Sequence, residues 1–136
     1  MMETTVELRN VPGTGAAMGW AGGHTVVIDR HEGKAGGSGL GFSGAQMLAL
    51  AMGGCFCNSL RFAAESLGIE VDTLEVTVTV KLGGEPLVTQ EAHLSVHCTR
   101  KDGGDTAELV ARAEQTCMVA NTLQRGVKVT VGHRAA

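Results

Sequence analysis

Residues 44–67 contain no proline and few β-branched side chains, which predicts one long helix. Ser43 precedes this segment and Gln46 follows three residues later, which is the spacing of a capping box. Gly68 comes directly after the segment and suits a left-handed cap, with Ile69 placed for the usual hydrophobic contact. We therefore expect a helix whose two ends are both marked in the sequence.

Two adjacent glycines, Gly53 and Gly54, lie in the middle of this predicted helix. Each costs about 1 kcal/mol relative to alanine at such a position. Two interpretations stay open. Either the glycines are merely tolerated, or they let another element or a substrate approach the helix backbone closely.

Two segments after the helix alternate between apolar and polar residues. The apolar positions are Leu74, Val76, Val78, Val80 and Leu82 in the first segment and Ala92, Leu94, Val96 and Cys98 in the second. The pair Gly83–Gly84 follows the first segment and can turn the chain. This pattern predicts an antiparallel hairpin with one buried face.

The remaining predicted elements are shorter. They are strands at 4–9 and 24–29, a glycine-rich turn at 12–19, a flexible loop at 31–44, a helix from a capping box at Asp105 and Glu108 to about Cys117, and a closing strand with Val127, Val129 and Val131. The order of elements predicts an α+β fold with two main helices on a mainly antiparallel sheet. The length suits a single domain over residues 1–136. Because such a sheet leaves edges unpaired in one chain, we also expect a homodimer.

Composition narrows the classes of function. Hydrophobic residues are 43% and charged residues 18% of the chain, which argues against disorder. A net charge of −3 provides no basic excess to neutralise phosphates. One tryptophan and three phenylalanines, with no tyrosine, leave little material for stacking on bases. We therefore expect no nucleic-acid partner.

The longest apolar run, Met47–Cys57, is far shorter than the roughly 20 residues that span a bilayer. The N-terminus lacks the basic and then apolar order of a signal peptide. These features predict no membrane association and a cytoplasmic location. In that compartment the four cysteines are expected to be reduced.

The four cysteines differ in their predicted surroundings. Cys98 lies on the apolar face of its strand and is expected to be a small core residue. Cys55 and Cys117 each fall on the core-facing stripe of a predicted helix, and two helices packed on one sheet could bring these stripes together. Cys57 points to another side of the first helix. Considered alone, the residues leave both a redox pair and inert core thiols open.

Other chemistry finds little support in the sequence. The segment Gly39–Gly44 fits G-x-G-x-x-G, but no strand runs directly into it, as a dinucleotide site requires. Paired C-x₂₋₄-C elements for zinc are missing, and His93 and His97 lie on the strand face opposite Cys98. No G-x-S-x-G nucleophile elbow is present. We expect neither a cofactor nor a metal.

Two segments resemble the OsmC/Ohr family of osmotically induced and organic-hydroperoxide-resistance proteins. They are GLGFSGAQMLALAMGGCFCNSLRFAAESLGIEV, residues 39–71, and AEQTCMVANTL, residues 113–123. The resemblance covers about residues 20–132. It implies an intertwined homodimer with its site at the subunit interface, and a thiol-dependent peroxidase of the oxidative stress response. By position Cys55 would attack an organic hydroperoxide and Cys117 would resolve the sulfenic acid as a disulfide. An outside dithiol, such as a dihydrolipoyl group, would then reduce this disulfide.

The sequence also departs from the family pattern. Peroxidase members carry a Pro-Glu pair where this chain has Gly44 and Ala45, and an arginine for which the nearest match is His24, with Arg30 as the alternative. The proline after the second cysteine is Met118. These departures keep a second hypothesis open, in which an OsmC-like protein without peroxidase activity binds a small apolar ligand at the dimer interface. Cys57 is an extra thiol for which either role is a minor alternative.

Overall fold

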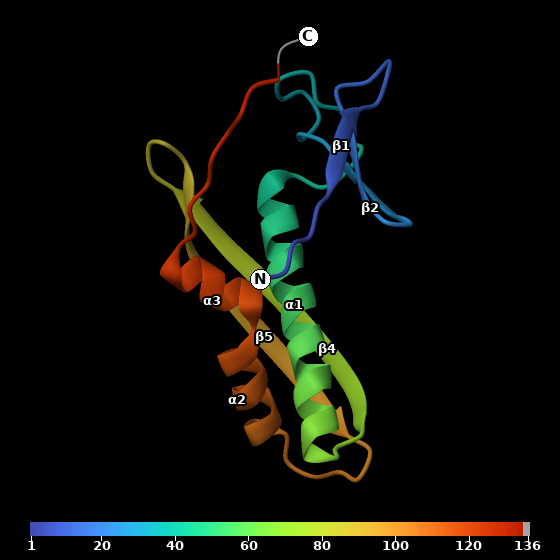
Figure 1. Ribbon diagram of the computed structural model, residues 1–136, viewed down its shortest axis with the longest axis vertical. Helices are drawn as coiled ribbons and strands as arrows, with labels where there is room; N and C mark the ends of the chain where they lie inside the picture. Colours follow the sequence, from blue (N-terminus) through green and yellow to red (C-terminus); the bar gives the residue numbers. More distant parts are fainter. Residues whose placement is uncertain (135–136) are drawn as a thin grey trace. The chain divides into compact units, whose positions relative to one another are not determined.

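The computed structural model describes residues 1–134 (Figure 1). The chain contains two compact units, one over residues 1–48 and one from residue 49 onward. Helix α1 (Gly44–Leu67) begins in the first unit and continues into the second. The order of elements predicted an α+β fold with two main helices on a mainly antiparallel sheet. The structure is α+β, with two separate antiparallel sheets. A single domain over 1–136 stays a prediction.

The first unit contains an antiparallel sheet in the order β1-β2-β3. Its strands are β1 (Glu7–Asn10), β2 (Ala17–Ala21) and β3 (His24–Ile28). Strand β1 overlaps the strand predicted at residues 4–9, and β3 lies within the strand predicted at residues 24–29. The middle strand was missed, because its start had been assigned to a glycine-rich turn. Gly19 lies inside this strand, although a Cβ there would make only ordinary contacts, at 3.5 Å from Leu8 Cγ and 3.6 Å from Ile28 Cδ1.

A buried carboxylate organises the glycine-rich loop that follows β3. Asp29 accepts backbone N–H bonds from Arg30 at 2.8 Å and from Ser38 and Leu40 at 3.0 Å. The hydrogen bonds from Leu40 and Ser38 hold the pKa of Asp29 below its usual range. The segment 31–43 forms neither a strand nor a helix apart from a single bridge at Phe42, as predicted, and this carboxylate ties its two ends together.

The two ends of α1 follow the sequence prediction closely. The backbone N–H of Ser43 donates to Gln46 Oε1 at 2.9 Å, and the N–H of Gln46 donates to Ser43 Oγ at 3.2 Å, which completes the capping box. At the other end Gly68 has a φ of 68°, and the N–H of Ile69 donates to Ala64 O at 2.9 Å. These bonds satisfy backbone groups that a helix end leaves without partners.

The two glycines of α1 have different surroundings. A Cβ on Gly53 would lie 2.9 Å from Val78 Cγ2, so the backbone of the helix approaches a strand closely at this point. A Cβ on Gly54 would meet nothing within 4 Å. Close approach therefore explains Gly53, and nothing in the structure of the single chain explains Gly54.

Helix α1 is long and apolar enough to cross a membrane by length and composition, and 39% of its most apolar window is buried within the protein. A core helix of a soluble protein passes the same test. Its buried residues include Met52, Phe56 and Leu60, and the last two belong to the hydrophobic core. The length and composition of this helix are by themselves weak evidence for a membrane span.

Strands β4 (Val71–Gly83) and β5 (Val88–Arg100) form the predicted antiparallel hairpin. The register places Leu74 opposite Cys98, Val76 opposite Val96 and Val78 opposite Leu94. The apolar side chains of the two strands therefore share one face, and the helices α1 and α2 lie over that face in Figure 1.

The C-terminal helical region differs from the prediction. It contains two helices, α2 (Ala107–Thr116) and α3 (Met118–Arg125), separated at Cys117. The second of them was not predicted. The expected capping box at Asp105 and Glu108 is wrong, because Thr106 is the N-cap and Glu108 pairs with Arg112 in the next turn.

The predicted closing strand at Val127, Val129 and Val131 is wrong for the part of the chain that the structure describes. These side chains are 68%, 78% and 95% exposed, and no strand pairs with them. Alternating valines favour a strand only where a neighbouring strand accepts their backbone hydrogen bonds.

The hydrophobic core of the second unit forms between the two helices and the hairpin. Its buried members are Phe56, Leu60, Ala63 and Ala64 of α1, Val71 of β4, Leu109 and Ala113 of α2, and Cys117. These residues come from α1, from β4, from α2 and from the junction that follows α2. One of the four cysteines is therefore part of this core.

Candidate thiol site

Cys55 and Cys117 lie in the same part of the second unit. Cys55 is half-buried on α1 and packs against the hydrophobic core, while Cys117 belongs to that core and is 0% exposed. Both are free thiols. The sequence left open whether the two cysteine-bearing stripes meet. In the structure Cys55 packs against the core that contains Cys117, at the junction that follows α2.

The two thiols are close enough to interact. Burial is the largest cause that raises the pKa of Cys117, and a hydrogen bond with the Cys55 side chain raises it further. The backbone N–H groups of Ala120 and Val119, at the start of α3, act in the opposite direction and lower it. Burial therefore keeps the reduced Cys117 protonated at neutral pH, with the Cys55 side chain near enough to affect its pKa.

The other two cysteines have separate surroundings. Cys98 is half-buried on β5 and packs against the core, which agrees with its predicted structural role. Burial raises the pKa of its thiol, and the positive charge of Arg61 partly offsets this effect. Cys57 is half-buried on α1.

The two candidate activating residues both lie in the first unit. His24 is exposed at the start of β3, opposite Ala21 in the strand register. Arg30 has local partners: its Nη2 donates to Gly15 O at 2.6 Å and lies 3.5 Å from Asp29 Oδ1. Arg30 therefore has a structural role in the loop, whereas His24 keeps an exposed imidazole.

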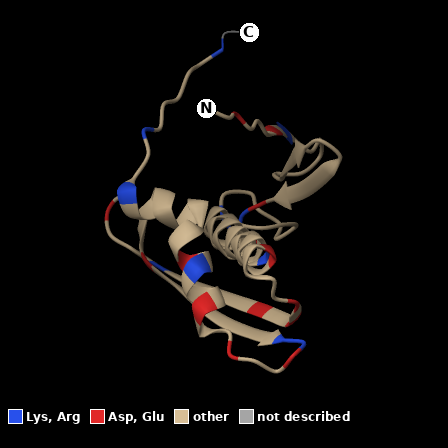
Figure 2. Cartoon of the chain, turned by 60° about the horizontal axis from the view of Figure 1, so that its bottom comes forward, with Lys and Arg blue, Asp and Glu red and all other residues tan. Residues whose placement is uncertain are grey.

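Helix α1 brings little charge to the thiol pair. Its first turn contains no acidic residue, since Gly44 and Ala45 begin it. Its charged residues are Arg61 and Glu65, both on the C-terminal side of Cys55, and Figure 2 shows most of the helix without charge. An activating charge for Cys55 must therefore come from outside this helix.

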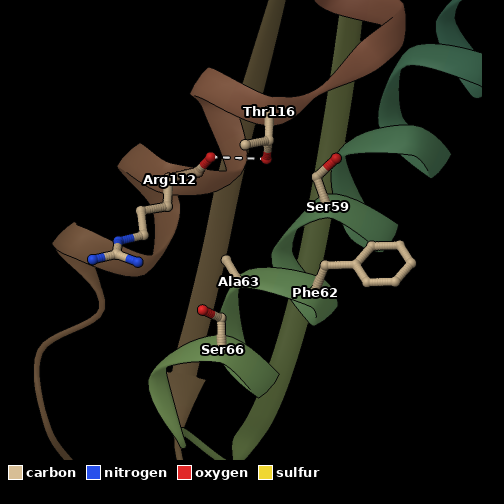
Figure 3. A pocket seen from close by; sticks show the side chains of 6 residues that line it. All are labelled: Ser59, Phe62, Ala63, Ser66, Arg112 and Thr116. Carbon is tan, nitrogen blue, oxygen red and sulfur yellow. Dashed lines mark hydrogen bonds between the residues drawn. The ribbon is translucent and has the colours of Figure 1, made fainter.

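A groove of about 380 Å³ lies between α1 and α2 (Figure 3). It is lined by Ser59, Phe62, Ala63, Ser66, Arg112 and Thr116. Ser59 lies one helical turn after Cys55, and Thr116 directly precedes Cys117, so one end of the groove is next to the thiols. The lining combines apolar side chains with three hydroxyl groups and one guanidinium.

No group of three or more potential metal ligands occurs among residues 1–134. His93 and His97 are exposed on β5, on the face opposite Cys98, as the alternation predicted.

Sequence reasoning missed that Cys117 begins a helix. The signal was Gly126, which ends α3 with a φ of 79° and donates its N–H to Thr122 O at 2.8 Å. A glycine of this kind marks a helix end, and counting back from it reaches Cys117 within about two turns. Asn121 supports the junction, because its side-chain amide donates to Gln115 O at 3.0 Å across the break.

Comparisons with known proteins give the same fold. The profile of the family described as OsmC-like protein matches residues 36–132. An OsmC-like protein from Mycoplasma pneumoniae superposes with a TM-score of 0.75 at 17% identity, covering 90% of this chain and 88% of that one. No curated protein matches the chain significantly.

Two further solved structures carry hydroperoxide resistance in their names. One, from Legionella pneumophila, has a TM-score of 0.64 at 20% identity and covers 91% of this chain and 90% of its own. The other, OhrB of Bacillus subtilis, has a TM-score of 0.58 at 24% identity and covers 89% and 90%. Because both sequence identities are below 25%, these two structures show only that the chain shares their fold. Since the family profile spans most of the sequence, the chain belongs to the OsmC-like protein family.

Proposed function

We propose that this protein is a thiol-dependent peroxidase that reduces organic hydroperoxides through a Cys55 sulfenate and a Cys55–Cys117 disulfide. The observation that supports this most strongly is that a half-buried Cys55 lies near enough to the fully buried Cys117 to affect its pKa. The organic hydroperoxide resistance proteins of the same fold add support. A reactive thiol next to a second thiol is the arrangement that oxidation to a disulfide requires.

The proposed reaction needs only these two sulfur atoms and a hydroperoxide. The Cys55 thiolate attacks the terminal peroxide oxygen, the O–O bond breaks, and the alkoxide takes a proton and leaves as an alcohol. Cys55 is then a sulfenic acid. The Cys117 sulfur attacks the Cys55 sulfur, water leaves, and the disulfide forms. An outside dithiol, for which a dihydrolipoyl group is our candidate, returns both cysteines to thiols.

His24 is the residue that we propose to favour the Cys55 thiolate. Arg30, the alternative, already binds Gly15 and lies beside Asp29. Replacement of His24 by alanine should lower kcat/KM for cumene hydroperoxide about tenfold or more, and His24→Arg should restore or exceed the original value. The matched control is His31→Ala in the same unit, which should leave kcat/KM unchanged. Equal rates for His24→Ala and the unmodified protein would remove His24 from the mechanism.

The active assembly that we propose is a homodimer in the cytoplasm. Several large apolar side chains of the second unit are strongly exposed in the single chain, among them Phe62 at 73% and Met118 at 64%. The valines of residues 127–131 are exposed as well. Large apolar side chains exposed in this number favour association with another chain. A reducing compartment would keep the four thiols free until a peroxide arrives.

The test of the function is peroxide consumption by matched cysteine variants. Cys55→Ser should abolish turnover of cumene hydroperoxide in the presence of dihydrolipoamide, because it removes the attacking sulfur. Cys57→Ser is the control on the same helix and should retain full turnover. Full activity in Cys55→Ser would contradict the proposal.

A second function is favoured by the groove between α1 and α2. Its mixed lining could hold a small, mainly apolar ligand, and the protein would then be a binding protein without peroxidase activity. In that case Cys55→Ala would leave ligand binding intact, while Ala63→Leu, which fills the groove, would weaken it. Loss of turnover in Cys55→Ala and no effect of Ala63→Leu would favour the peroxidase.

A further inference from the structure

The two sulfur atoms of the proposed disulfide have unequal access to an outside thiol. Cys55 is half-buried, whereas Cys117 is 0% exposed. A thiolate that breaks a disulfide must approach one sulfur in line with the S–S bond. The exposed fraction therefore favours attack on Cys55 over attack on Cys117.

The two sulfur atoms also differ in how well they can accept negative charge. Cys117 is the N-cap of α3, with φ −65° and ψ 106°. The N–H groups of Val119 and Ala120 lie near enough to its sulfur to lower the pKa of the thiol, although no side-chain capping hydrogen bond of full geometry is formed in the reduced state. A helix N-terminus favours an anion at this position. A thiolate on Cys117 would therefore have donors in place.

Cys55 has no comparable donors. It lies well inside α1, where the backbone N–H groups are already bonded to the carbonyl groups of the preceding turn. The charged residues of that helix, Arg61 and Glu65, lie on its C-terminal side. The donors at the start of α3 therefore face Cys117 and not Cys55.

We propose that the external dithiol attacks Sγ of Cys55 and that Cys117 is the leaving thiolate, received by the first turn of α3. This inference rests on the proposed Cys55–Cys117 disulfide and gives its reduction a direction. Access favours this direction, because the more exposed sulfur is the one attacked. The N–H groups at the start of α3 offset part of the cost of a buried thiolate on Cys117.

Reduction of the disulfide takes two thiol–disulfide exchange steps. One thiolate of the dithiol bonds to Cys55 Sγ, the Cys55–Cys117 bond breaks, and its electron pair goes to Cys117 Sγ. The second thiolate of the dithiol then attacks its own partner sulfur in the mixed disulfide, and Cys55 leaves as a thiolate. The dithiol becomes a cyclic disulfide, and both cysteines take up protons from water.

The first experiment locates the mixed disulfide. The protein, with Cys57 and Cys98 replaced by serine, is oxidised with diamide, so that disulfide formation does not depend on peroxidase activity. The oxidised protein is then treated briefly with 2-mercaptoethanol as the probe thiol, and free thiols are trapped with iodoacetamide. Peptide mass spectrometry should find mercaptoethanol on Cys55 and carbamidomethyl on Cys117, in about tenfold excess over the reverse pattern.

The possible outcomes separate the inference from the proposed function. A Cys55–Cys117 disulfide with the adduct mainly on Cys117 would overturn the direction and leave the peroxidase proposal intact. A failure of diamide to join the two cysteines would contradict both.

A second experiment tests the role of the helix start with two variants at one position. Val119→Pro removes the backbone N–H, and proline is tolerated best in the first turn of a helix. Val119→Ala keeps the N–H and shortens the side chain. The rate of disulfide reduction by 2-mercaptoethanol should fall about fivefold in Val119→Pro relative to Val119→Ala, with both variants equally helical by circular dichroism. Equal rates would show that α3 does not receive the leaving thiolate.

Discussion

At the scale of single residues, burial sets the chemical reactivity of the cysteines. The pKa values of Cys98 and Cys117 are raised, in both cases chiefly because the surrounding protein disfavours a thiolate. We expect iodoacetamide to modify Cys117 most slowly of the four at pH 8, and its rate to keep rising above pH 9. Time-resolved peptide mass spectrometry measures both. Early modification of Cys117 would contradict the burial described here.

The lowered pKa of Asp29 predicts how the stability of the protein depends on pH. Its folded-state pKa is lowered, chiefly by the hydrogen bonds from Leu40 and Ser38, so its contribution to stability is present above the unfolded value of about 3.9 and is lost as pH falls through the lower folded value. Asp29→Asn keeps only one acceptor oxygen and leaves at least one backbone N–H without its partner. The melting temperature should fall at pH 7, and the loss between pH 4 and pH 2 should become smaller.

The control for this prediction is Asp72→Asn, an exposed position on β4. It should leave both the melting temperature and its dependence on acid close to those of the unmodified protein. An unchanged melting temperature in Asp29→Asn would mean that the carboxylate does not hold the loop.

At the scale of elements, the two glycines of α1 offer a matched pair. Gly54→Ala should raise the free energy of unfolding by about 1 kcal/mol, because alanine favours the helix and nothing lies in its way. Gly53→Ala adds a methyl group against Val78, a stiff side chain. We expect the two variants to differ by about 1–3 kcal/mol in urea unfolding. A loss in Gly54→Ala would reveal a contact made only by an assembled partner.

The elements that the sequence predicted well are those with local signals. The capping box at Ser43 and Gln46 and the cap at Gly68 are formed by residues within one turn of each helix end, so both ends of α1 could be predicted. The hairpin of β4 and β5 was predictable because its alternation is strict over many residues.

The elements that were missed depend on distant or competing interactions. Strand β2 contains Gly19, and only its two neighbouring strands make it a strand. Helix α3 follows a break at Cys117, and its local signal, Gly126, marks the end of the helix and not its start. From the residues alone, Cys55 and Cys117 could be either a redox pair or separate core thiols. Helix periodicity shows which face of a helix a cysteine occupies, but not how far it lies from a cysteine on another helix.

At the scale of the whole molecule, assembly is the remaining prediction. The exposed Phe62, Met118 and the valines of residues 127–131 favour burial against another chain. Light scattering at micromolar concentration should give twice the mass of the 14.0 kDa chain. Replacement of Phe62 by aspartate should shift the equilibrium towards monomers, whereas Glu65→Asp one turn along the helix should not. A monomer in the unmodified protein would contradict the proposed dimer.

The most direct test of the account is a count of thiols after one equivalent of cumene hydroperoxide. We predict the rapid loss of two thiols, mapped by mass spectrometry to a disulfide between Cys55 and Cys117, while Cys57 and Cys98 stay free. The same amount of hydrogen peroxide should react more slowly. Survival of all four thiols, or a disulfide that excludes Cys117, would contradict the central claim that these two cysteines form a peroxide-reactive pair.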